Sequence, residues 1–159
     1  MKKINSLQDW KEHLWRTMDV YNISMASVGL DKSLYGKYQY YTWEDIPKPD
    51  GTFNRYWRQM WNESKALYSW KTDIVTGKDI GYDGVASFNI QTRTWFTDMM
   101  GNATVNGVWG DVYITASSKS MVIVYSAPLF NVTEPTNNIH EASTHKRLGA
   151  AKSNLSLKF

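Results

Sequence analysis

The stretch DVYITASSKSMVIVYSAPLF, residues 111–130, has the pattern of a β-hairpin. Apolar side chains alternate with polar ones over residues 112–116, a polar run follows at 117–120, and residues 121–125 are apolar throughout. Alternation indicates a strand with one buried face, whereas a continuous apolar run indicates a strand covered on both faces. We therefore predict that the second arm is a central strand of an antiparallel sheet, with pairing that ends or reaches an edge near Pro128.

The pattern before this hairpin divides the chain into helical and extended parts. Residues 6–21 place Leu7, Trp10, Leu14, Met18 and Tyr21 at three- and four-residue steps, which is one apolar stripe of an amphipathic helix. Residues 52–70, TFNRYWRQMWNESKALYSW, also place apolar side chains on one broad helical face and predict a second helix. Residues 85–98, VASFNIQTRTWFTD, alternate with a period of two and predict one or two strands.

These elements predict an α+β fold in which two N-terminal amphipathic helices pack on a three- to five-stranded antiparallel sheet. Residues 1–139 form the single globular domain of this prediction, and residues 140–159 form a basic C-terminal arm. A chain of 159 residues is long enough to bury a core of its own.

The composition excludes several classes of site. The chain has no cysteine, so disulfides, thiolate metal sites and cysteine nucleophiles are ruled out. Its apolar runs are too short for a membrane span, and the N-terminal residues lack the apolar stretch of a secretory signal. We accordingly expect a cytoplasmic protein that does not contact a membrane. Aromatic residues make up 14% of the chain, enough to fill a core and also to form a contact surface.

Charge is concentrated at the C-terminal end. The net charge of the chain is +3, and the residues after Ile139 hold four basic side chains against the single acid Glu141, which also gives +3. Phosphate groups are commonly bound by such a mixture of cations, hydroxyls and imidazole. The predicted nucleic-acid or partner contacts in the arm are His145, Lys146, Arg147 and Lys152. Two other roles stay open for the arm: a solvated terminus, or a strap that packs back on the domain.

A second basic set lies in the predicted second helix. Arg55, Arg58 and Lys65 share one face at helical spacing and form a possible second phosphate-binding stripe. The same stripe also fits the solvated side of an amphipathic helix, with Glu63 partly offsetting its charge.

No sequence motif indicates catalysis, a metal or a cofactor. The chain lacks the glycine-rich phosphate loops and the G-x-S-x-G serine motif, and its three histidines lack metal-ligand spacing. We expect no metal, no cofactor and no catalytic activity. One catalytic alternative is a small metal-independent ribonuclease in which His140 and His145 act as base and acid.

The strand that ends Tyr125-Ser126-x-Pro128, followed by Ser143, Thr144, His145 and Lys146, resembles a pattern in small uncharacterised bacteriophage proteins. The resemblance covers about the last third of the chain and implies a phage origin. We predict a non-catalytic phage or mobile-element accessory protein that binds nucleic acid or a host complex carrying it, in host takeover or anti-defence. A virion or assembly component is the third alternative. The oligomeric state stays open.

Overall fold

The computed structural model describes residues 7–101, 106–115, 118–130 and 146–157 of the chain. Within these residues the strands join into one antiparallel sheet in the order β5-β4-β3-β2-β1-β9-β8-β6, and β7 also pairs with β8. The strands are β1 (Met25–Leu30), β2 (Gln39–Pro47), β3 (Phe53–Met60), β4 (Ala66–Thr72), β5 (Asp79–Ser87), β6 (Val108–Trp109), β7 (Tyr113–Ile114), β8 (Met121–Phe130) and β9 (Arg147–Ser156). The helices are α1 (Leu7–Tyr21), α2 (Lys32–Tyr35), the 3-10 turn η1 (Ile90–Thr92) and α3 (Thr94–Gly101).

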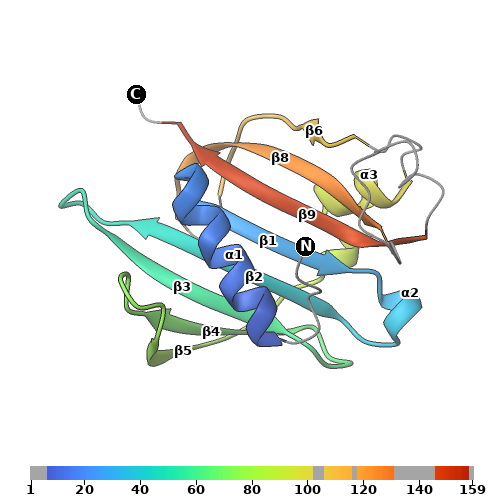
Figure 1. Cartoon of the computed structure of the whole chain (residues 1–159), viewed down its shortest axis with the longest axis horizontal. Coiled ribbons are helices and arrows are strands. Elements are labelled where there is room, and N and C mark those ends of the chain that lie inside the picture. Colours follow the sequence, from blue (N-terminus) through green and yellow to red (C-terminus); the bar gives the residue numbers. More distant parts are fainter. Residues whose placement is uncertain (1–6, 102–105, 116–117, 131–145, 158–159) are drawn as a thin grey trace.

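The predicted first helix is confirmed as α1. It buries Leu14 and Met18 and lies across β1 and β2 on one face of the sheet (Figure 1). Three- and four-residue spacing puts both side chains on the face that meets the sheet. The helix packs on Val28, Trp43 and Trp57, so the apolar stripe read from the sequence is its contact surface.

The predicted second helix is wrong, because residues 53–60 and 66–72 form the paired strands β3 and β4. Trp57 lies in register between Trp43 of β2 and Trp70 of β4, so three indoles line up across adjacent strands. Aromatic cross-strand neighbours of this kind stabilise sheets. Both faces of β3 carry large side chains, so its apolar positions fit a helical period as well as the extended one.

The predicted fold class is therefore also wrong. The described part of the chain is a nine-stranded antiparallel sheet with one long helix and two short ones, rather than two helices on a three- to five-stranded sheet. Part of the predicted strand at 85–98 is helical as well. There the Asn89 side chain accepts a hydrogen bond from Gln91 N and caps η1, while Phe96 and Met99 are the buried side chains of α3.

The predicted hairpin at residues 112–125 is confirmed, with Tyr113 opposite Val122 in the β7–β8 pair. Its second arm is less central than predicted. β8 lies beside β9 and next to the short edge strands β6 and β7, and Tyr125 is 38% exposed while Val124 is 4% exposed. Part of the predicted C-terminal arm is a strand of the sheet. Arg147–Ser156 form β9, which pairs with β1 on one side and with β8 on the other.

Candidate ligand-binding pocket

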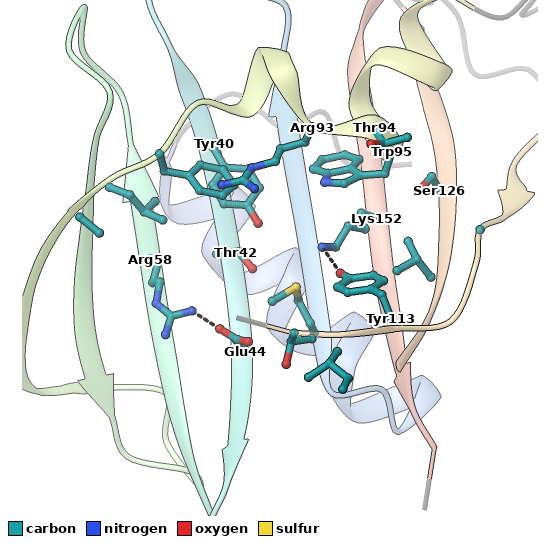
Figure 2. Close-up of a pocket in the computed structure, with 18 of the residues that line it drawn as sticks. Tyr40, Thr42, Glu44, Arg58, Arg93, Thr94, Trp95, Tyr113, Ser126 and Lys152 are labelled. Carbon is teal, nitrogen blue, oxygen red and sulfur yellow. Dashed lines mark hydrogen bonds and ion pairs between the residues drawn. The ribbon is translucent and has the colours of Figure 1, made fainter. Parts of the chain in front are cut away.

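A cavity of about 1170 Å³ lies on the sheet face opposite α1. Its floor comes from β1–β4, β8 and β9, and its walls come from β5, from the turn into α3, and from the segment that carries β6 and β7 (Figure 2). Strand alternation explains the separation from α1: Thr42 and Glu44 face the cavity, whereas Trp43 between them packs under the helix.

The floor of this cavity is polar. Its buried polar members come from four different strands. They are Thr42, Glu44, Ser69, Ser126 and Lys152. The antiparallel register places these polar side chains next to one another across the strands. Thr42 pairs with Arg58, and Ser126 pairs with Lys152. Sheet faces that serve only as a core are normally apolar, so a floor of this composition is typical of a binding site.

One side of the floor holds a connected set of charges. The Arg58 guanidinium forms an ion pair with Glu44, which is 2% exposed, and its Nε donates to Ser69 Oγ at 3.3 Å. Ser69 Oγ in turn donates to Asp83 Oδ2 at 3.3 Å. These interactions connect β2, β3, β4 and β5 and leave the Arg58 charge compensated.

Lys152 stands on the other side of the floor without such compensation. The residue is 8% exposed, and its ammonium donates to the Tyr113 hydroxyl at 3.2 Å. It also lies 5.4 Å from the ring centre of Trp95 and 5.8 Å from that of Tyr113. Among the described residues it makes no ion pair. Figure 2 shows Lys152 and Tyr113 pointing toward one another, with Trp95 beside them.

Aromatic side chains form the wall near α3. Tyr40 stacks on Phe88 with ring centres 5.0 Å apart and lies 6.4 Å from Trp95. The Arg93 guanidinium lies 4.4 Å over the Phe88 ring. These rings give the cavity flat apolar surfaces beside its polar floor, a combination that suits an organic molecule with both kinds of group.

On the cavity face of the sheet, the hydroxyls of Ser27 and Thr42 lie 2.7 Å apart, and Tyr40 donates to Ser27 Oγ at 3.1 Å. Asn154 is 1% exposed, and its Oδ1 has no hydrogen-bond partner within the described residues. Asn154 lies two residues from Lys152 on the same strand face. A buried acceptor without a partner destabilises the fold, so this face is not optimised for stability alone.

The predicted phosphate-binding stripe is not assembled. Arg55 and Arg58 lie three residues apart on a strand, so they point to opposite faces of the sheet. Arg55 forms a bidentate ion pair with Asp45, in which Nε and Nη2 donate to the two carboxylate oxygens at 2.7 Å and 2.9 Å. Its Nη1 donates to Asp19 Oδ1 at 3.0 Å. Burial raises the pKa of Asp45 and the guanidinium opposes that rise; burial alone would lower the pKa of Arg55, but its two carboxylates raise it overall. Lys65 is exposed in the β3–β4 turn.

The predicted arm contacts are also spread out. Lys146 is exposed, Arg147 donates to the Met99 carbonyl, and Lys152 faces the cavity. His140 and His145 lie outside the described residues. Four cavity residues were not predicted as site residues from the sequence: Glu44, Trp95, Tyr113 and Ser126. One signal for Glu44 was available: Thr42 and Glu44 alternate with large aromatic residues in YYTWE, where a purely structural strand would carry apolar side chains on both buried faces.

No cluster of histidine, aspartate and glutamate suited to a metal ion occurs among the described residues. No helix in the described ranges is long and apolar enough to cross a membrane.

No family model matches the chain, and no curated protein matches it. A solved structure, the extracellular domain of a protein described as a histidine kinase, is similar at 12% sequence identity with a TM-score of 0.47. The match covers 96% of this chain and 44% of that one, so the chain spans less than half of its length.

Proposed function

We propose that this chain is a binding module that holds a small organic molecule in the cavity opposite α1. One observation carries the proposal: a cavity of about 1170 Å³ has a floor of buried charged and hydroxyl side chains. Small-molecule sites in proteins have this size range and this mixture of apolar walls and a few convergent polar groups.

Burying charged side chains in the cavity floor is unfavourable for folding, and this supports a role in binding. Burying Glu44, Arg58 and Lys152 removes charged groups from water, and well-packed apolar side chains in their place are often neutral or more stable. The other face of the same strands buries Val28, Trp43 and Trp57, so the sheet readily supports an apolar interior. Burial of these charged groups disfavours folding, and all of them converge on the cavity, so we infer that they contact the ligand.

Thermal unfolding with a panel of small acids, amines, sugars and nucleosides tests the proposal. A ligand present at about ten times its Kd is expected to raise the melting temperature by about 3–5 °C, because it binds the folded state alone. Ser126→Trp fills the floor beside Lys152 and is expected to abolish the response. Leu155→Trp places the same indole at a 41% exposed position on the opposite face and is expected to keep the response. The proposal fails if no compound changes the melting temperature, or if Ser126→Trp responds like the parent.

Nucleic-acid binding, a phage origin and a cytoplasmic location stay predictions. Of the seven predicted contact residues, Arg55 is held by two carboxylates, while Arg58 and Lys152 face the cavity. Polarisation of labelled RNA and DNA at several salt concentrations measures the nucleic-acid prediction directly, since phosphate contacts weaken steeply with salt. Cleavage of the labelled RNA in the same samples would instead support the ribonuclease alternative.

A further inference from the structure

We infer that the cavity binds a ligand through a single anionic group, a carboxylate, which is seated at Lys152 between Trp95 and Tyr113. This inference rests on the proposed function, and it specifies the class of ligand. Figure 2 shows the three side chains grouped on one side of the cavity, away from the Arg58–Glu44 pair.

The charge of Lys152 is buried without a charged partner among the described residues. An ammonium in a residue that is 8% exposed has lost most of its water, and a hydrogen bond to one neutral hydroxyl replaces little of it. Buried charges in proteins are normally paired. Glu44 is the buried carboxylate of the floor, and it is paired with Arg58. No carboxylate of the described residues forms an ion pair with Lys152, so an anionic group of a ligand would be its counter-ion.

The groups around Lys152 also favour an anion. Ser126 is 3% exposed and adjacent to Lys152 in register, and its hydroxyl makes no side-chain hydrogen bond within the described residues. The Tyr113 hydroxyl accepts from Lys152, so its own proton is available to donate. An ammonium and two hydroxyl donors beside an indole ring would satisfy both oxygens of a carboxylate.

The other residues that line the cavity indicate the chemistry of the ligand beyond its carboxylate. Tyr40, Phe88 and Trp95 offer stacking surfaces to a flat or aliphatic body. Asp83, Asp98 and Asp111 also line the cavity, and their negative charge disfavours ligands with several anionic groups such as nucleotides. The expected class is thus a monocarboxylic acid with an apolar or aromatic body.

The test compares phenylacetate with its neutral isostere phenylacetamide, with the cation phenethylamine and with inorganic phosphate, by calorimetric titration of the full chain. We expect phenylacetate to bind at least about tenfold more tightly than phenylacetamide, because a hydrogen-bonded charge pair has that magnitude. Lys152→Met is expected to weaken phenylacetate binding by about 10- to 100-fold. The matched control is Lys37→Met at an exposed position outside the cavity, and it is expected to bind like the parent.

The stability of the free protein separates a binding role from a structural one. Removing an uncompensated buried charge while keeping its packing is expected to leave the melting temperature of Lys152→Met unchanged or raised by about 2–4 °C. A structural lysine would instead lower it. Tyr113→Phe, at a 39% exposed site, removes one donor with little risk to folding and is expected to weaken phenylacetate binding several-fold.

Four results would overturn the inference. Equal binding of phenylacetate to Lys152→Met and to the parent would show that Lys152 does not bind the carboxylate. A clear loss of melting temperature in the free Lys152→Met variant would show that Lys152 has a structural role. Tighter binding of phenylacetamide, phenethylamine or phosphate than of phenylacetate would refute the ligand class while leaving the proposed function standing. Absence of a response to phenylacetate refutes the inference, and absence of a response to the whole panel refutes the proposed function as well.

Discussion

The two faces of the sheet differ in what they bury. Under α1, the strands present Val28, Trp43 and Trp57, which form a continuous apolar core with the helix. On the opposite face, the same strands present Thr42, Glu44 and their polar neighbours to a cavity. Because successive residues of a strand point to opposite faces, one set of strands serves both purposes. The α1 face buries one apolar core. The cavity face carries a second apolar cluster around Ile90, Phe96 and Met99 and, beside it, the polar groups that we propose contact a ligand.

The largest expected effect comes from breaking the α1 face at Trp57. Its ring is 2% exposed and lies 5.3 Å from Trp43 and 6.3 Å from Tyr41. Trp57→Ala removes this packing and leaves a large cavity, so we expect a loss of about 3–5 kcal/mol in the free energy of unfolding measured in urea. Val75→Ala, at an 81% exposed position, should change it by less than about 0.5 kcal/mol. A similar small change for Trp57→Ala would contradict the placement of the core.

Arg55 tests whether a charge on the α1 face behaves differently from Lys152. It is 6% exposed and paired with Asp45 and Asp19. Arg55→Met leaves the largely buried Asp45 carboxylate without its partner, so we expect a loss of about 3 kcal/mol in the free energy of unfolding. Arg16→Met removes an exposed ion pair and should cost less than about 1 kcal/mol. If Arg55→Met and Lys152→Met changed stability in the same direction, the contrast between the faces would be wrong.

Gly149 tests the close contact between β9 and β1, on which both faces depend. A Cβ at this position would lie 2.0 Å from the Gly29 carbonyl oxygen and 2.8 Å from the Leu30 Cα, so the backbones would have to separate. We expect Gly149→Ala to cost about 1–3 kcal/mol in thermal unfolding. Gly81→Ala, where nothing lies within 4 Å of the added carbon, should be close to neutral. Equal stability of the two variants would place β9 farther from β1.

Asp73 lies in the β4–β5 turn, outside both faces, and its effect should be the smallest. Hydrogen bonds from Thr76 and from Val75 N lower the pKa of this exposed carboxyl below its usual value. A lowered pKa means that the stabilisation is present above the unfolded-state pKa of about 3.9 and is lost as the pH falls through the folded-state value. Asp73→Ala should therefore be slightly less stable than the parent at pH 7, and the two melting temperatures should converge in acid. A difference that persists in acid would assign the stabilisation to another group.

The sequence predicted secondary structure correctly where the apolar residues fitted only one period, either helical or extended. Residues 7–21 match a helical stripe and no strand pattern, and residues 112–125 combine alternation with a polar turn; both predictions are confirmed. The helix predicted at residues 52–70 was wrong because the rings of Tyr56, Trp57 and Trp61 fit both the helical and the extended period. The order of the strands decides between the periods, and that order depends on pairing partners distant in sequence.

The cavity was beyond the reach of sequence patterns for the same reason. Thr42 and Lys152 share its floor because β1 lies between β2 and β9. Arg58 and Lys152 were selected from their charge alone, and charge does not distinguish a solvated cation from one that faces a cavity. The excess of bases near the C-terminus suggested an exposed arm, yet Ala150, Lys152 and Asn154 are buried in a strand in the middle of the sheet.

The most direct test of the two-face account uses the indole signals of the eight tryptophans in a proton–nitrogen NMR spectrum. Trp95 and Trp109 line the cavity, whereas Trp43 and Trp57 are buried under α1. Titration with the compound that raises the melting temperature most should shift the signals of Trp95 and Trp109 and leave those of Trp43 and Trp57 in place. Shifts at Trp43 and Trp57, with Trp95 and Trp109 unmoved, would contradict the account.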